Sequence, residues 1–356
     1  MENQGQIKSG EFSQGDEFPL TWRRGEGPRV VIEYLFPDLP CDSSATDEMI
    51  AVLHEEEENA VARMVHFFLQ ARYEESSAEA ERCMRSRHPE IRDFALLIHT
   101  IIHVAQHNVE VALHDLQILQ QQMQHSANRR VAAQNDIYRY VLPVFFHLGE
   151  DIVPLPQEIL PYCSEGTRLF LLYARSYALY LQQAYEHALG VAEAALMMAD
   201  MCHPLISIYL NLAASMAAMN LSRFQLADRF FLNALELAIP EGYIQPFIGH
   251  HGPLQGMVEK HIRDREPKLY KMIAEKVVHF RTGWTEIHNP RSSHKVTTLL
   301  TPYEFALAMM ASKGKTNKEI ADYLHISINT VKSHLSTIYR ILDVTKRTEL
   351  KERLNL

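Results

Sequence analysis

Apolar residues recur at steps of three and four from Asp47 to Phe280, which is the spacing of one face of an α-helix. Breaks such as His88-Pro89 and His203-Pro204 divide this stretch into segments of helical length. Segments of this kind, joined by short breaks, predict antiparallel helical hairpins. We therefore expect an all-α domain over residues 46–281.

Small residues in this domain recur with a constant offset. Ala188, Ala195 and Ala199 are followed 39 positions later by Ala227, Ala234 and Ala238, and an earlier predicted helix contains Ala112. Stacked helix pairs need small residues where their backbones approach closely, and the period is near that of tetratricopeptide-like repeats. The sequence thus predicts a tetratricopeptide-like helical-hairpin repeat domain, with an irregular, alanine-rich helical domain as the alternative.

The flanks of this domain have a different composition. Residues 1–45 are rich in Gly, Pro and acidic side chains and predict a loosely ordered arm. Its apolar patch, Val30 to Phe36, fits either a strand-like segment or an extended stretch packed on the body. Gly283, Asn289 and Pro290 interrupt the helical pattern, so we expect a linker over 282–298 and a second domain over 299–356.

The second domain opens with strong helix-start signals. Thr301 can cap a helix, Pro302 suits its first position, and Glu304 completes a capping box. This helix is predicted to end before Gly314. A second helix is predicted over 316–324, with the apolar face Ile320, Ala321 and Leu324.

A third helix is predicted from Ile328 to Leu342, after a turn at 325–327 in which Ser327 is a good N-cap. A short closing helix is expected to pack Leu350 and Leu354 inward. The spacing of the third helix directs four residues to the core: Val331, Leu335, Ile338 and Leu342.

The opposite face of the third helix carries hydrogen-bond donors suited to base edges and phosphate oxygens. In a helix-turn-helix, the N-terminal residues of the recognition helix meet the bases. The sequence therefore predicts four base contacts: Asn329, Lys332, Ser333 and Ser336. The alternative is a four-helix cap whose periodicity reflects only core packing.

Several short motifs of this domain match one family: 315–321 (KTNKEIA), 326–327 (IS), 330–335 (TVKSHL), 338–339 (IY) and 347–350 (RTEL). With them the domain resembles the four-helix DNA-binding domain of LuxR-type regulators. Where that family usually has an Arg-Glu pair in its first helix, this chain has Tyr303-Glu304.

The resemblance places Lys332, Ser333 and Ser336 in the major groove of double-stranded DNA. It also implies a homodimer, usually formed through the closing helix, and RNA polymerase as a partner. The predicted phosphate contacts are Thr316, Asn317, Lys318, Thr330, Arg340, Lys346 and Arg347.

Charge divides the chain at the same place. The whole chain has 35 Lys and Arg against 44 Asp and Glu, but residues 290–356 contain 11 basic and 6 acidic residues. The C-terminal domain is therefore basic and the rest strongly acidic. An acidic body repels a phosphate backbone, so we expect it to bind a partner or ligand.

A second resemblance concerns residues 238–256, which contain the stretch Gly242 to Phe247. This passage is similar to the end of the repeat domain in MalT-like members of the LuxR group. There the helical repeats bind an effector, which favours a sensor domain here. Those proteins also carry an ATPase module, but the string GKT at 314–316 lacks the upstream glycine of a P-loop, because Met309 stands there.

Other site chemistry is weak in this sequence. His99, His103 and His107 recur at helical spacing with His114 nearby, but no Cys or carboxylate stands at matching spacing. A solvated or inter-repeat histidine-rich face is therefore favoured over a metal site. No nucleophile elbow or dinucleotide turn is present. We predict no enzyme activity, cofactor or metal.

The sequence contains neither a secretory signal nor a membrane span at the N-terminus or elsewhere, so a cytoplasmic location is expected. These observations together predict a dimeric transcription regulator that reads an inverted repeat and responds to an effector or partner on its helical repeats. The alternative is a protein-interaction scaffold with only generic DNA affinity.

Overall fold

The computed structural model describes most of the chain from residue 56 onward. The described residues are 56–122, 129–146, 154, 155, 157, 160, 163, 165–199, 203–288 and 299–354. Every regular element among them is helical, which confirms the all-α class. The predicted N-terminal arm, with its patch at Val30 to Phe36, lies outside these residues. No helix in the described part is both long and apolar enough to cross a membrane.

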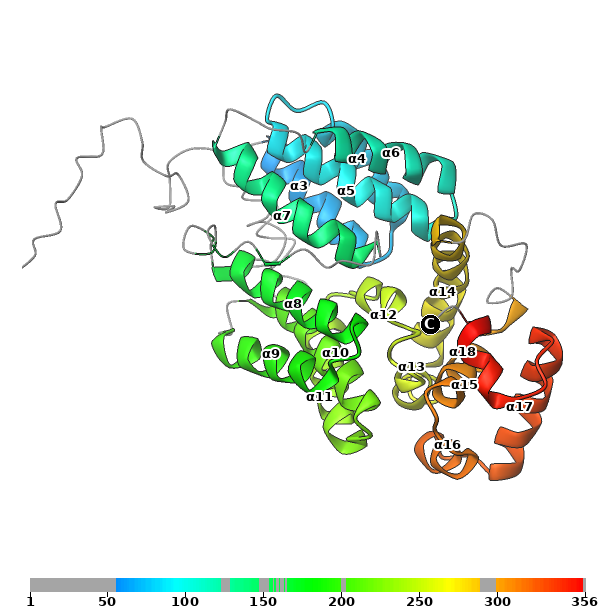
Figure 1. Ribbon diagram of the computed structural model, residues 1–356. Helices are drawn as coiled ribbons and strands as arrows, with labels where there is room; N and C mark the ends of the chain where they lie inside the picture. Colours follow the sequence, from blue (N-terminus) through cyan, green and yellow to red (C-terminus); the bar gives the residue numbers. More distant parts are fainter. Residues whose placement is uncertain are drawn as a thin grey trace, which may run out of the picture.

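The first stack, α3 to α7, lies at the top of Figure 1. Within it, α3 packs on α4 and α5 on α6, and α7 lies alongside α5 and leads to α8. The bounds are α3 Glu56–Leu69, α4 Tyr73–Cys83, α5 Pro89–Ala105, α6 Val109–Gln122 and α7 Arg129–Phe145.

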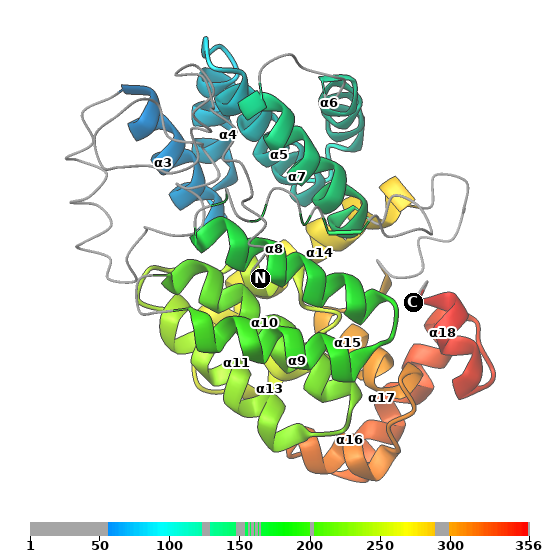
Figure 2. The same cartoon turned by 60° about the vertical axis from the view of Figure 1, so that its left-hand side comes forward.

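The second stack contains two further hairpins, α8 with α9 and α10 with α11 (Figure 2). Its central helix is α10, in which nearly every side chain from Leu205 to Met219 is buried because α8, α9, α11 and α12 surround it. The bounds are α8 Glu165–Leu181, α9 Tyr185–Met198, α10 Pro204–Asn220 and α11 Phe224–Ala238.

The four hairpins share the same turn, and two of them share the same internal bond. Each turn contains one left-handed residue that is not glycine: Ala71, His107, Gln183 and Ser222. The hydroxyl of Ser176 donates to the carbonyl of Ala188 at 2.8 Å, and 39 positions later Ser215 donates to Ala227 at 3.0 Å. The 39-residue offset of the sequence therefore corresponds to equivalent positions in two hairpins. Their likeness to tetratricopeptide units stays a prediction.

Three helices connect the stacks to the C-terminal domain: α12 Gln245–Gly249, α13 Met257–His261 and α14 Pro267–His288. The last of these contacts α5 and α6. Residues 282–288, which we expected in the linker, belong to α14. Gly283 lies inside this helix and does not break it. A Cβ at this position would overlap the backbone oxygen of Val104. This glycine permits the close approach of α14 to the end of α5. The rest of the predicted linker, 289–298, lies outside the described residues.

The histidine row of α5 has protein partners. His99 Nδ1 lies 2.6 Å from an oxygen of Asp115 on α6, and its Nε2 lies 3.0 Å from Nε2 of His103. His107 instead faces Glu286 of α14, at 2.9 Å. These contacts join α5 to α6 and α14. Within the described part of the chain, no three His, Cys, Asp or Glu side chains are arranged to hold a metal ion.

The C-terminal domain has the four helices that the sequence predicts, with a short 3-10 turn before the last. Its bounds are α15 Pro302–Ser312, α16 Asn317–Leu324, α17 Ile328–Leu342, η3 Arg347–Glu349 and α18 Leu350–Arg353. Leu350 and Leu354 are buried, as expected for the closing helix. In Figures 1 and 2 this domain lies beside α13 and α14, with α16 between α17 and the body.

Candidate nucleic-acid interface

The two faces of α17 are separated as the apolar spacing predicts. Val331, Leu335, Ile338 and Leu342 are each at most 3 % exposed and pack within the domain. The opposite face is exposed at Asn329, Lys332, Ser333, Ser336 and Arg340. At 1.5 Å per residue, this polar row is about 16 Å long. A row of that length, rich in donors, fits the major groove of a duplex.

The start of α17 is fixed by its cap. Ser327 Oγ accepts the backbone N–H of Thr330 at 3.0 Å, and the two hydroxyls lie 2.8 Å apart. The preceding turn depends on His325, which has a left-handed backbone (φ 56°) at the end of α16. These local bonds set the angle at which α17 leaves the turn and so the direction in which its polar face points.

The scaffold helix α16 starts with a complete capping box. Thr316 Oγ1 accepts the N–H of Glu319 at 3.2 Å, and the Glu319 carboxylate accepts the N–H of Thr316 at 2.7 Å. The hydrogen bond from the Thr316 backbone lowers the pKa of Glu319. Of the predicted phosphate contacts here, Thr316 and Lys318 are exposed, and Asn317 is half-buried.

Arg347 is occupied within the domain. Its guanidinium donates to the carbonyl of Ala311 at 3.1 Å, to Oδ1 of Asn317 at 2.8 Å and to the carbonyl of Lys315. These bonds tie the closing segment to the end of α15 and the start of α16. Its neighbour Lys346 is exposed. A phosphate contact from Arg347 stays a prediction, whereas its structural bonds are evident.

The outer side of α16 is docked on the helical body through Tyr323. The Tyr323 ring lies 4.0 Å under the ammonium of Lys260 and 5.4 Å from the ring of Phe224. Asp228 lies beside these residues, and its carboxylate accepts hydrogen bonds from Lys260 Nζ and His261 Nε2, each at 2.7 Å. Partial burial acts to raise the pKa of Asp228, but the bonds from His261 and Lys260 outweigh it and the pKa is lowered.

Lys315 makes the second docking contact and points away from the predicted DNA surface. Its Nζ donates to the carbonyl of Met219 at 3.1 Å and to Ser222 Oγ at 2.8 Å, and it lies 4.5 Å from the centre of the Phe224 ring. Burial lowers the pKa of Lys315. The turn between α10 and α11 is therefore attached directly to the residue before the cap of α16.

The first helix, α15, is attached by α14 and the preceding loop. Arg281 of α14 donates to the carbonyl of Leu300 and lies 4.4 Å from the centre of the Phe305 ring. A Cβ on Gly252 would lie 3.1 Å from the Phe305 ring, and one on Gly256 would lie 3.3 Å from Leu324 and 3.4 Å from Met310, so both glycines are in close contact with the C-terminal domain. Both glycines lie in the 238–256 passage, so this passage forms part of the surface that contacts the C-terminal domain.

The family departure at Tyr303 has a structural counterpart. The Tyr303 ring lies edge-on to His334 of α17 at 5.2 Å and under the guanidinium of Arg263 at 4.6 Å. His334 is half-buried. Tyr303 thus joins the recognition helix to the body, a role that an ion pair within the domain would not fill.

The docking contacts were not predicted from the sequence, although one signal was present. At 100° per residue, Ile320, Ala321 and Leu324 span about 100° of α16, and Tyr323 extends this apolar stripe to about 160°. Tyr323 is 5 % exposed because the body covers it. Helices α15 and α17 contact α16 within the domain, whereas Tyr323, at the edge of the stripe, packs against the body.

Comparisons with known proteins agree with this geometry. Residues 298–353 match the family of bacterial regulatory proteins of the luxR type. The chain is 39 % identical over 84 residues to the transcriptional regulatory protein LiaR of Bacillus subtilis (strain 168), covering 24 % of this chain and 37 % of LiaR. It is 43 % identical over 58 residues to the transcriptional regulatory protein ComA of the same strain, covering 16 % and 27 %.

A third similar protein is the putative HTH-type transcriptional regulator YhjB of Escherichia coli (strain K12), 37 % identical over 67 residues, or 19 % of this chain and 34 % of YhjB. The chain thus spans between about a quarter and two fifths of these relatives. No solved structure matches the chain significantly. The C-terminal domain is a helix-turn-helix domain of the LuxR family.

Proposed function

We propose that this protein is a sequence-specific DNA-binding transcription regulator whose acidic helical body controls a LuxR-type domain. The supporting observation is that α17 exposes its polar face while its apolar face is fully buried. Asn329, Lys332, Ser333 and Ser336 are the base contacts of this proposal. Lys332 is central, because a lysine placed on guanine contributes about 1–3 kcal/mol of discrimination between bases.

The regulator acts as a homodimer in this proposal. Two recognition helices in major grooves one helical turn apart require an inverted repeat with half-site centres about 10 base pairs apart. Exposed Lys318, Thr330, Arg340 and Lys346 bind phosphates on either side of each groove. RNA polymerase is the expected protein partner, as the resemblance to LuxR-type regulators implies.

The body is the controlling element because it holds the DNA-binding domain at three places. Tyr323, Lys315 and Phe305 are each bound by residues of the body. These contacts involve α15 and the outer side of α16 and leave the polar face of α17 exposed. An effector or partner on the body can therefore act on the position of α17 through these contacts, without touching DNA.

Selection of random duplexes on the purified full-length chain tests the proposal, at a stated salt concentration because phosphate contacts make affinity salt-dependent. We expect enrichment of an inverted repeat. Lys332→Ala should reduce the preference for that repeat by about 5- to 150-fold. The matched control is Lys268→Ala, which removes an exposed cation on α14 of the body, away from the proposed DNA contacts and the closing helix.

The outcomes separate the regulator from a scaffold with generic DNA affinity. Loss of the sequence preference in Lys332→Ala, but not in Lys268→Ala, supports direct base contact. If Lys332→Ala only lowers the slope of log affinity against log salt by about one, Lys332 contacts phosphate and the scaffold is favoured. If no sequence is enriched, specific DNA binding by the free chain is refuted.

A further inference from the structure

A large cavity lies between the two helical stacks and reaches the DNA-binding domain. Its volume is about 860 Å³, which is within the usual range for sites that bind small organic molecules. Its walls come from α3, α5, α7, α8, α9, α10, α12 and α14 and also from the C-terminal domain, through residues such as Phe305, Met309 and Leu354. A molecule in this cavity would therefore contact both halves of the protein.

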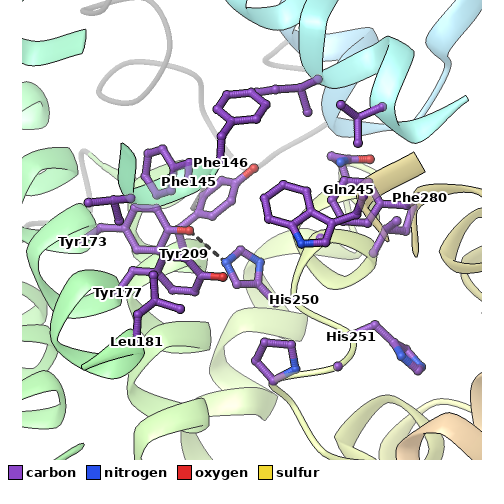
Figure 3. A pocket seen from close by; sticks show the side chains of 18 of the residues that line it. Phe145, Phe146, Tyr173, Tyr177, Leu181, Tyr209, Gln245, His250, His251 and Phe280 are labelled. Carbon is purple, nitrogen blue, oxygen red and sulfur yellow. Dashed lines mark hydrogen bonds between the residues drawn. The ribbon is translucent and has the colours of Figure 1, made fainter. Parts of the chain in front are cut away.

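The walls of the cavity are mainly aromatic (Figure 3). On one side Phe145 stacks on Tyr173, with ring centres 5.5 Å apart. On the other side Trp284 stacks against Phe146 at 6.3 Å and Phe280 at 5.8 Å. Such surfaces bind flat ring systems well, because offset and edge contacts add to the burial of apolar area.

His250 lies among the tyrosines in Figure 3. Its Nδ1 is 2.7 Å from the carbonyl oxygen of Pro246, which can only accept, so Nδ1 donates. Nε2 then accepts the hydroxyl of Tyr173 at 2.8 Å. Burial lowers the pKa of His250 to about 4. This histidine therefore fixes Tyr173 in the wall and adds no positive charge to the cavity at neutral pH.

Arg281 supplies the positive charge. It lines the cavity and is 8 % exposed, and its Nη2 donates to the carbonyl of Leu300. Its Nε and Nη1 are buried without a hydrogen-bond partner among the described residues. Burial lowers the pKa of Arg281 to about 10, so the group remains protonated at neutral pH. Buried cations are normally paired, and unpaired donors of this kind favour an anionic partner.

The rest of the lining agrees with an anion. Among the described residues that form the cavity, none is Asp or Glu, while Lys313 is a second cation. An aromatic cation would be repelled by Arg281, and a neutral hydrocarbon would leave Nε and Nη1 unsatisfied. A ligand with both rings and one anionic group satisfies the aromatic walls and the guanidinium together.

We propose that this cavity is a binding site for an aromatic organic anion, with Arg281 binding its anionic group and the stacked rings of both walls binding its ring system. The role of such a molecule as the effector rests on the function proposed above, but its binding does not. Arg281 also contacts Leu300 and Phe305. The group that binds the ligand is therefore the group that holds the start of the DNA-binding domain.

A pair of fluorescent probes tests the charge requirement on the full-length chain. Anilinonaphthalene sulfonate is an aromatic anion, and N-phenylnaphthylamine has the same ring system without the sulfonate. The sequence has two tryptophans, Trp22 and Trp284. In a Trp22→Phe background, quenching of Trp284 by energy transfer reports binding in the cavity. We expect one site with a clear preference for the sulfonate.

Arg281→Met should weaken binding of the sulfonate by about 10- to 100-fold, which is the range for a lost charge-assisted hydrogen bond. It should leave the affinity of the neutral probe unchanged. Lys271→Met is the matched control, since this lysine is exposed on the same helix. Leu181→Trp fills part of the cavity from α8, leaves Arg281 in place, and should weaken both probes. Because this variant adds a tryptophan, its binding is measured from the emission of the directly excited probes.

Equal affinity of the wild-type chain for the two probes would overturn the proposal, even if Arg281→Met proved unable to fold. Unchanged sulfonate binding in folded Arg281→Met, or unchanged binding of both probes in Leu181→Trp, would also overturn it. The titrations contain no DNA, so their failure is distinct from a failure of the duplex selection. A positive titration with a negative selection would retain the ligand site and reject the regulator.

Discussion

Removal of the Arg347 side chain should weaken the C-terminal domain more than it weakens phosphate binding. In Arg347→Ala the carbonyls of Ala311 and Lys315 and the amide oxygen of Asn317 lose their donor. A hydrogen bond to a charged group contributes about 1.5–3 kcal/mol. Three bonds from one half-buried side chain do not add fully, so we expect a loss of about 3 kcal/mol in the free energy of opening of α15 and α16.

Amide hydrogen exchange of the full-length chain measures this directly. A loss of about 3 kcal/mol corresponds to exchange roughly 150-fold faster for amides of α16 that exchange by opening of the domain. Lys346→Ala is the matched control, because Lys346 is exposed. It should leave exchange unchanged and reduce the salt slope of DNA binding by about one.

The opposite result would refute this reasoning. If Arg347→Ala left exchange in α15 and α16 as in the wild type but reduced the salt slope as Lys346→Ala does, the three internal bonds would contribute little. Arg347 would then be a phosphate contact, as its place in the sequence first predicted.

Two further changes test the packing and the cavity wall. Gly283→Ala should destabilise the protein by about 1–3 kcal/mol, because its Cβ would overlap Val104. Gly190→Ala, in a helical position with open space, should instead stabilise it by about 0.5–1 kcal/mol. Thermal unfolding of both variants tests this, and equal shifts in the unfolding temperature would contradict the packing of α14. Burial lowers the pKa of His250 from an ordinary 6.5 to about 4. Between these pH values the unfolded chain binds a proton that the folded chain does not. The free energy of unfolding should therefore fall as the pH falls from 6.5 toward 4, by at most about 1.4 kcal/mol per pH unit. In His250→Gln this part of the pH dependence, measured by urea unfolding, should disappear, and an unchanged slope would argue against a neutral buried imidazole.

The helices of the C-terminal domain were predictable almost to the residue, because the ends of these helices depend on local signals. Thr301, Thr316 and Ser327 each cap a helix with their own side chain, and each bond spans three residues. The apolar spacing of α17 likewise depends only on neighbouring turns of one helix. Such features depend on a few neighbouring residues, so they can be predicted without knowledge of the rest of the fold.

Features that depend on distant partners were not predictable in this way. Gly283 has the composition of a linker residue, and only the position of Val104, far away in the sequence, shows that it belongs to a packed helix. Arg347 is basic and near the predicted interface, yet its partners are carbonyls brought to it by α15 and α16. The cavity is likewise formed by eight helices of the body and the C-terminal domain, so no single segment carries its pattern.

In the proposed dimer, the docking of α16 on the body restricts how two copies can share an operator. Half-sites one helical turn apart are about 34–36 Å apart. A chain of this length packs into a body on the order of 50 Å across. Two copies that keep Tyr323 and Lys315 docked therefore cannot both lie directly above their half-sites. Their bodies must lean outward along the duplex or to opposite sides of it, and this would make the footprint on DNA considerably longer than the sequence that is read.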